Sequence, residues 1–135
     1  MTAATATSLT FTDAELVAAV HATGARHGWD DAQLRRVTAG LRVLRMLAIA
    51  GTTITYGQYA ELVQPEPLLA YAATGHQLDF ARDVCLDHGR LTLGSLVVSQ
   101  ATSECSYGWE SDGLTPAEAR AQAWAAYGAR RTPAL

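Results

Sequence analysis

The sequence predicts one mainly helical α+β domain, in which two long N-terminal helices are followed by a helix-turn-helix-like pair, a short hairpin and a C-terminal helix. Three observations favour this class. Capping sequences recur along the chain, apolar residues repeat at helical spacing between them, and the apolar run at residues 91–98 ends in β-branched residues typical of a strand. With 135 residues, 49% of them hydrophobic, the chain can bury one core.

We expect residues 1–10 to form a disordered tail and residues 11–135 to form a single globular domain. Residues 2–8 are all Thr, Ala or Ser, which offer little apolar surface to pack. No stretch approaches the roughly 18 uninterrupted apolar residues of a membrane span, and the N-terminus has no basic region ahead of an apolar one. The expected protein is cytoplasmic and has no membrane partner.

The first helix is predicted over residues 13–26. Thr12 and Glu15 have the spacing of a capping box, in which each side chain accepts a hydrogen bond from the backbone of the other. Phe11, just before the cap, can pack on Leu16 as a hydrophobic staple.

The second helix is predicted to begin after Asp30, with Gln33 as the capping partner, and to end near Gly51. Its apolar residues repeat at helical spacing, and four arginines fall largely off that stripe. These arginines form the one dense basic surface that the sequence predicts: Arg35, Arg36, Arg42 and Arg45. A solvated outer face is the usual explanation of such a run, and contact with an anionic partner is the alternative.

The middle of the chain predicts two shorter helices and a strand. Thr55 and Gln58 form a third capping pair, which predicts a helix over residues 56–63 that stops before a proline. A fourth pair predicts a helix over residues 75–88, and residues 91–98 follow as a strand. This order indicates a helix-turn-helix-like pair with a strand behind it.

The C-terminal part predicts a strand and a last helix. Tyr107 and Trp109 are predicted to start a second strand, which would complete the hairpin. Thr115 and Glu118 form another capping pair, with a proline between them at the first helical position, and open a helix that runs to Gly128.

The stretch Ile-Thr-Tyr-Gly-Gln-Tyr-Ala-Glu-Leu at residues 54–62, together with the helix and the apolar run that follow it, resembles a known DNA-binding segment. Residues 54–98 are similar to the DNA-binding part of the alkylguanine-DNA alkyltransferase and alkyltransferase-like family. There a Thr-Tyr-Gly start opens the first helix, an alanine-rich turn with Gly opens the recognition helix, and an apolar strand carries the catalytic cysteine. The chain also resembles an uncharacterised group of small bacterial proteins with a Tyr-Gly helix start, a cysteine-bearing helix and a Leu-Val-Val strand.

This resemblance implies a winged-helix-like fold with double-stranded DNA as the partner, but no alkyl transfer. Tyr56 matches the tyrosine that lies against the DNA backbone in the family, whereas the intercalating arginine falls near Ala72. The Pro-Cys-His-Arg motif falls near residues 93–96, where Gly94 and Ser95 stand instead. Without a thiolate, alkyl transfer has no acceptor. The candidate DNA contacts are Tyr56, Gln58, Arg42 and Arg45.

The predicted helix over residues 75–88 supports an alternative function. His76, Asp79, Asp83 and Asp87 fall in a narrow sector opposite its apolar residues. Carboxylates on that face would repel phosphate groups, and the formal charge of −3 also opposes a general nucleic-acid surface. The alternative is an accessory protein whose acidic face docks a basic protein partner. Histidine and carboxylate at this spacing could also bind zinc or manganese, but nothing else marks such a site, and no cofactor is expected.

No catalytic residue is predicted. Cys85 and Cys105 have the spacing of neither a zinc pair nor a disulfide framework, so free thiols are expected. Ser95 with His88 and Asp87 would be a poor triad, because the last two are sequence neighbours whose side chains diverge on a helix. The sequence favours a nonenzymatic role, and a hydrolase or thiol enzyme that uses Ser95 or Cys105 is the open alternative.

Overall fold

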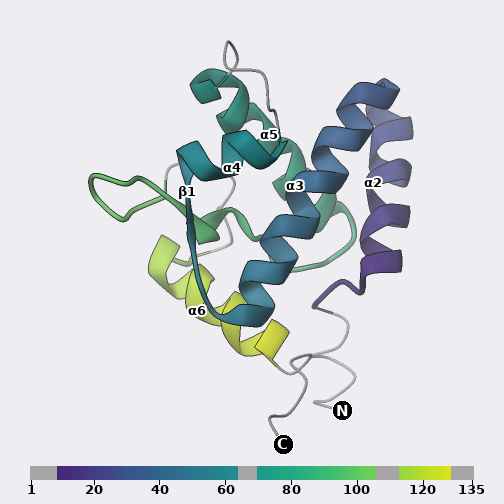
Figure 1. Cartoon of the computed structure of the whole chain (residues 1–135). Coiled ribbons are helices and arrows are strands. Elements are labelled where there is room, and N and C mark those ends of the chain that lie inside the picture. Colours follow the sequence, from purple (N-terminus) through teal and green to yellow (C-terminus); the bar gives the residue numbers. More distant parts are fainter. Residues whose placement is uncertain (1–8, 64–69, 106–112, 129–135) are drawn as a thin grey trace, which may run out of the picture.

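The computed structural model describes residues 9–63, 70–105 and 113–128, with residues 70–76 described by their backbone alone (Figure 1). Within these residues the fold is mainly helical and contains a two-stranded sheet. The elements in chain order are α2 (Asp13–His27), α3 (Asp31–Ala50), β1 (Ile54–Thr55), α4 (Tyr56–Val63), α5 (Ala70–Asp87), η2 (Gly94–Leu96), β2 (Val97–Val98) and α6 (Pro116–Gly128). No described helix has the length and hydropathy needed to cross a membrane.

The first helix begins where the sequence predicts and ends one residue later. Thr12 Oγ1 accepts the Glu15 N–H at 3.1 Å, and Glu15 Oε1 accepts the Thr12 N–H at 2.8 Å, so the capping box is complete. Gly28 ends the helix with φ of 71°, a left-handed conformation that glycine adopts without strain. Of the expected tail, residues 1–8 lie outside the described residues, and the Leu9 carbonyl accepts the Leu91 N–H at 3.0 Å.

The second predicted helix corresponds to α3, although its capping box is only half formed. Asp30 Oδ1 accepts the Gln33 N–H at 2.8 Å, but the Gln33 side chain does not return to the cap. It exchanges hydrogen bonds of 3.4 and 3.1 Å with the amide of Gln77 on α5. Gln77 is buried, so this reciprocal amide pair satisfies polar groups inside the α3–α5 contact.

The helix α5 begins five residues before its predicted start. A capping pair of Thr74 and Gln77 would begin the helix at residue 75, whereas α5 begins at Ala70. The prediction is wrong because the Gln77 side chain pairs with Gln33 instead of capping the helix.

The helices α4 and α6 have the predicted bounds, and both capping boxes are complete. Gln58 Oε1 accepts the Thr55 N–H at 3.1 Å, and Thr55 Oγ1 accepts the Gln58 N–H at 3.2 Å. At α6, Glu118 Oε1 accepts the Thr115 N–H at 2.9 Å, and Thr115 Oγ1 accepts the Glu118 N–H at 3.2 Å.

The predicted strand over residues 91–98 is wrong for most of its length, because only Val97 and Val98 are strand and residues 94–96 form the 3-10 helix η2. β2 pairs in parallel with β1, in the register Ile54 with Val97 and Thr55 with Val98, a pairing that the sequence did not predict. A parallel pair needs a crossover, which α4 and α5 supply. The predicted second strand at residues 107–109 lies outside the described residues.

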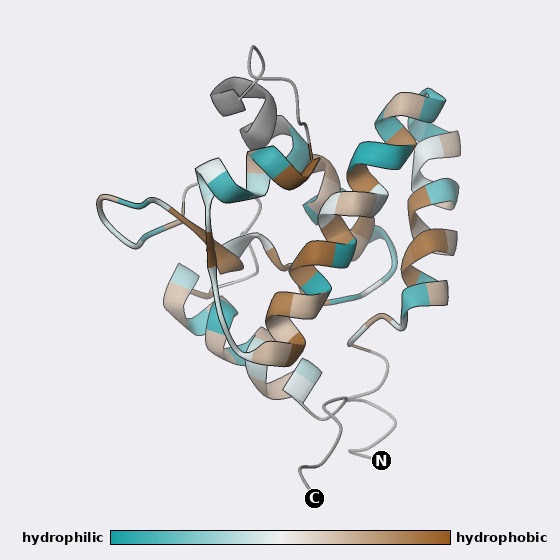
Figure 2. Cartoon of the chain, viewed as in Figure 1, coloured by the Kyte–Doolittle hydropathy of each residue, from teal (hydrophilic) through white to brown (hydrophobic). Residues whose placement is uncertain are grey.

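The core forms around α3, which contacts α2, α4, α5, α6 and η2. Figure 1 shows α2 alongside α3 and α6 across the lower end of α3, and Figure 2 shows hydrophobic residues along α3 and in β2. The largest fully buried side chains come from every layer: Tyr59, Tyr127, Phe11, Leu16, Leu41, Leu44, Leu78, Leu93 and Leu96. Gly40 allows α3 to approach α4, because a Cβ atom at this position would meet the ring of Tyr59.

Candidate functional site

The first two predicted DNA contacts lie together at the start of α4. Gln58 is exposed, and its side chain is held by the capping box with Thr55. Tyr56 is half-buried and packs against the core. Gly57 between them has open space around it, because a Cβ atom there would meet nothing within 4 Å. The start of α4 is therefore an exposed polar surface with an accessible backbone.

The other two predicted contacts lie together on α3, where they hold the start of α2. Arg42 donates from Nε and Nη2 to the two carboxylate oxygens of Asp13, at 2.9 and 3.0 Å. This hydrogen-bonded pair lowers the pKa of Asp13 below its ordinary value. Arg45 Nε donates to the Phe11 carbonyl at 2.8 Å.

The two predicted contacts on α4 and the two on α3 do not form one surface, because Arg42 and Arg45 lie on the side of α3 that faces away from α4. Gly40 faces the Tyr59 side chain of α4, and Arg42 follows two residues later, which is about 200° around the helix axis. Arg42 and Arg45 therefore face the α2 side of α3, away from Tyr56 and Gln58.

The carboxylates of the predicted acidic face are paired with arginines of the same chain. Arg82 lies 3.4 Å from Asp79 and 3.3 Å from Asp83. Asp87 turns toward α2, where it accepts hydrogen bonds from Arg26 and from the Thr23 hydroxyl, the latter at 2.8 Å. The Arg26 hydrogen bond is the main cause that lowers the pKa of Asp87. The side chain of His76, the fourth member of the predicted face, lies outside the described residues.

Three arginines of α3 have no carboxylate partner among the described residues: Arg35, Arg36 and Arg45. Arg45 donates to the Phe11 carbonyl, whereas the exposed Arg35 and the half-buried Arg36 have no hydrogen-bond partner in this part of the chain. Arg36 precedes Gly40 by four residues, so both lie on the side of α3 that packs against α4. Arg35 is about 100° further round the helix. Sequence reasoning grouped the four arginines as one basic surface and chose Arg42 and Arg45 as the DNA contacts, although the four-residue spacing to a glycine could have separated Arg36 from Arg42.

A closed loop follows β2. Ser99 donates its N–H to the Glu104 carbonyl at 2.8 Å, and Ser103 donates to the Ser99 carbonyl at 2.8 Å. Residues 100–104 are exposed, and the loop projects beyond the sheet that leads into α4 (Figure 1). Its abundance of Ser and Thr predicted a loop, but its position beside α4 depends on the β1–β2 pairing.

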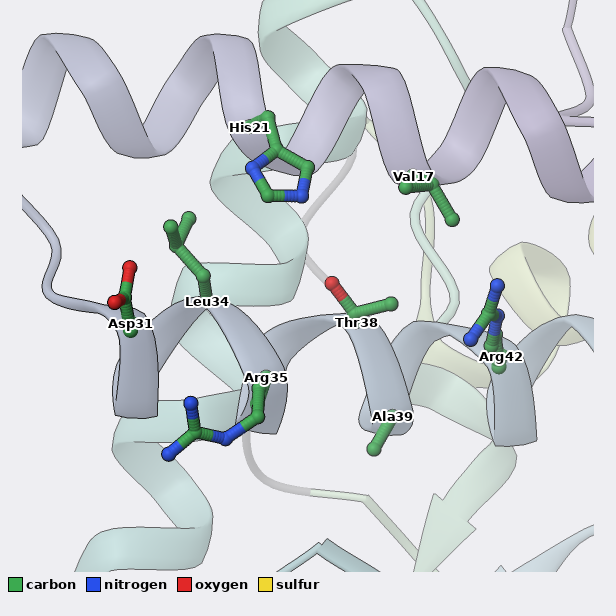
Figure 3. A pocket seen from close by; sticks show the side chains of 8 residues that line it. All are labelled: Val17, His21, Asp31, Leu34, Arg35, Thr38, Ala39 and Arg42. Carbon is green, nitrogen blue, oxygen red and sulfur yellow. The ribbon is translucent and has the colours of Figure 1, made fainter.

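A groove of about 350 Å³ lies between α2 and α3, at the small end of the range of ligand pockets. Val17 and His21 come from α2, whereas the Thr38 hydroxyl and the Arg42 guanidinium point toward α2 from α3 (Figure 3). The remaining lining residues are Asp31, Leu34, Arg35 and Ala39. The groove thus has an apolar floor with scattered polar groups, and it contains no nucleophile paired with a base.

The candidate nucleophiles do not form a catalytic site. Asp87 and His88 both reach Thr23, with His88 Nε2 3.3 Å from its hydroxyl, so neither serves Ser95 as a triad partner. Cys85 and Cys105 are buried and form no disulfide within the described residues, and burial raises the pKa of the Cys85 thiol to about 12. Within the described part of the chain, no group of three His, Cys, Asp or Glu residues could hold a metal ion.

The described residues therefore present an exposed helix start, a closed loop beside it and two arginines, Arg35 and Arg36, with neither an acidic nor a hydrogen-bonding partner among them, rather than a catalytic centre. Comparisons of the chain with protein-family models, with curated proteins and with solved structures find no match.

Proposed function

We propose that this chain is a noncatalytic nucleic-acid-associated module of winged-helix-like type that contacts double-stranded DNA. We define its contact surface, the α4 face, as Tyr56, Gln58, Arg36 and the loop at residues 99–104, and we include the exposed Arg35, next to Arg36 on α3, as a second cation at its edge. One observation carries the proposal: α4, whose start is exposed and polar, packs through Tyr59 and Val63 on the side of α3 that holds Arg36, and no described carboxylate neutralises Arg36 or Arg35.

The backbone around α4 is suited to rigid recognition. The β1–β2 pairing fixes the residue before α4, and the Thr55–Gln58 box fixes its first turn. Gly57 leaves open space at that turn, so a phosphate could approach the N–H groups and the positive end of the helix. Because these elements are already ordered in the free chain, binding would cost little conformational entropy.

The charges of the described residues support a local contact rather than a broad one. Phosphate binding depends on cations that release counterions, and each neutralised phosphate contributes to the salt dependence of affinity. Arg35 and Arg36 have no acidic partner among the described residues and can fill this role, whereas Arg42 is bound to Asp13. The net charge of −3 limits nonspecific attraction, so we expect modest affinity that depends on these two side chains.

The acidic residues of α5 give no second candidate function. Asp79, Asp83 and Asp87 each contact an arginine of the same chain, so they do not form an unpaired surface for a basic partner.

The test is fluorescence anisotropy of a labelled DNA duplex between about 50 and about 200 mM salt. The Arg35→Gln/Arg36→Gln variant should bind more weakly, and the slope of log affinity against log salt should shrink by about 0.9 for each phosphate that the variant no longer neutralises. The matched control is Arg42→Gln/Arg82→Gln, which removes the same charge from two arginines that are already paired. It should change the salt slope much less.

Two outcomes would overturn the proposal. One is the absence of duplex binding by the wild-type chain at the lowest salt. The other is an equal decrease of affinity in the two double variants, because that would mean that net charge alone, and not the α4 face, sets the interaction. Circular dichroism of each variant checks that the helical content is retained.

A further inference from the structure

Two buried polar atoms without a hydrogen-bond partner belong to residues that contact each other, one in η2 and one in α6. Ser95 is 0% exposed, and its Oγ has no hydrogen-bond partner. The Nη2 atom of Arg120 is also buried and without a partner. Both findings concern the residues that the structure describes. Buried polar atoms are almost always paired, so two neighbouring unpaired ones point to a ligand, ion or water that binds them both.

A hydrogen bond joins the two residues that carry these atoms. Arg120 Nε donates to the Ser95 carbonyl at 2.8 Å. Nη2 belongs to the same guanidinium, and Oγ belongs to the same serine as the carbonyl. A single small acceptor can therefore receive hydrogen bonds from both the hydroxyl and the guanidinium.

The charge of Arg120 selects the kind of acceptor. The described arginines with carboxylate partners are Arg26, Arg42, Arg82 and Arg90. Within the described residues, the hydrogen-bond partner of Arg120 is a neutral carbonyl. A water molecule would complete the hydrogen bonds but would leave the guanidinium charge unbalanced in a partly buried position, which is costly. An anion would satisfy both requirements.

We propose that Ser95 and Arg120 form a binding site for one small monovalent anion of the halide class, which joins η2 to α6. The ligand must be small because Ser95 is closed to solvent. It accepts one hydrogen bond from the Ser95 hydroxyl and one from Arg120 Nη2, and its charge balances the guanidinium. This site is independent of the α4 face and would exist whether or not the chain binds DNA.

The first test is chloride NMR of the full chain in solution. Exchange with a protein site broadens the chloride resonance, and added bromide should reverse the broadening by competition. We expect Arg120→Met, which keeps the length of the side chain but removes its charge, to abolish the excess line width. Ser95→Ala should reduce it. The control Arg82→Met, at an arginine paired with Asp79 and Asp83, should leave it unchanged.

The second test locates the ion. Crystals soaked in bromide should show an anomalous peak in contact with Ser95 Oγ and Arg120 Nη2. Water density without an anomalous signal would overturn the proposal, as would chloride broadening that persists in both variants. A bromide peak in the crystal without excess line width in solution would mean an adventitious ion only. If Arg120→Met does not fold, Ser95→Ala and Arg120→Gln, which also removes the charge, test the same prediction.

Discussion

Replacing Gly40 by alanine tests the close approach of α3 to α4. A Cβ atom at this position would collide with Tyr59 Oη and would lie 3.2 Å from Tyr59 Cζ, tighter than an ordinary contact. The Tyr59 ring is rigid and only 1% exposed, so it cannot move without disturbing its neighbours. Val63 Cγ2 at 3.5 Å is an ordinary contact and should tolerate the change.

The magnitude follows from two opposing effects. Forcing an extra methyl group into a packed interior costs about 1–3 kcal/mol, and alanine favours a helix over glycine by about 1 kcal/mol. Gly57→Ala provides a reference, because its added methyl meets nothing within 4 Å and should stabilise the chain by about 0.4–1 kcal/mol. The difference in unfolding free energy between the two variants should therefore equal the overpacking cost, about 1–3 kcal/mol.

Urea unfolding followed by circular dichroism measures both variants against the wild type. A double-mutant cycle then identifies the colliding atom, because Tyr59→Phe removes Oη and should recover part of the stability that Gly40→Ala removes. The packing argument is refuted if Gly40→Ala is as stable as Gly57→Ala. It is also refuted if the penalty is the same with and without the Tyr59 hydroxyl.

Three further predictions concern the interior and the α2–α5 contact. Tyr127→Phe should lower the unfolding free energy by about 1–3 kcal/mol, because the buried Phe11 N–H, which donates to Tyr127 Oη at 3.0 Å, loses its acceptor; an unchanged urea midpoint would contradict this. Asp87→Asn should reduce the loss of unfolding free energy that the wild type shows as the pH falls. Arg26 holds the pKa of Asp87 below its ordinary value of 3.8, so the unfolded chain takes up the proton first, and the wild type loses stability as the pH falls toward and below that value. An equal loss of unfolding free energy in the wild type and in Asp87→Asn between about pH 6 and about pH 2.5 would exclude this linkage. Cys85, with its pKa raised by burial to about 12, should resist iodoacetamide at neutral pH until guanidinium unfolds the chain, and native labelling found by peptide mass mapping would contradict its burial.

The helix starts were predictable because their signals are local. Thr12 with Glu15 and Thr55 with Gln58 each form the expected reciprocal hydrogen bonds between residues three apart. The same spacing failed at Gln77, because its side chain pairs with Gln33, 44 positions away. A capping pattern therefore predicts a helix start well only where no distant polar partner competes for the side chain.

The strand was less predictable because its length depends on a distant partner. Residues 91–98 are apolar and compatible with a strand, but β1 offers only Ile54 and Thr55 for pairing. Parallel pairing through two helices leaves no local signal, whereas a hairpin would have had a turn sequence. The preceding residues, which lack a partner strand, turn into η2 instead.

The candidate site was predictable only as a set of residue types. The four arginines of α3 were visible in the sequence, but the residues that they contact were not. An arginine that already binds a carboxylate is less able to bind a phosphate, so these contacts decide which arginines can bind DNA. Asp13 binds Arg42 across 29 positions, while Arg36 faces α4. Ser95 and Arg120 could not be connected at all, because their hydrogen bond joins residues 25 positions apart in elements of different kinds.

The two proposals rest on arginines that differ in their access to water. Arg35 is exposed, and Arg36 is half-buried at the surface of α3, so water can solvate their charge and a polyanion can exchange with salt ions there. Arg120 has a buried nitrogen beside a fully buried serine, so its charge is best balanced by an ion that remains in place.

Chloride should then act in opposite directions on the two sites. In one titration from gluconate to chloride at constant ionic strength, the unfolding midpoint should rise with chloride in the wild type but not in Arg120→Met, since an ion that binds only the folded chain stabilises it. Raising the total salt should weaken duplex binding in both chains alike, because the effect comes from counterions at Arg35 and Arg36. If Arg120→Met altered the salt slope of DNA binding as strongly as Arg35→Gln/Arg36→Gln, the anion site and the DNA contact would not be separate. The assignment of accessible arginines to DNA and of Arg120 to a buried ion would then be wrong.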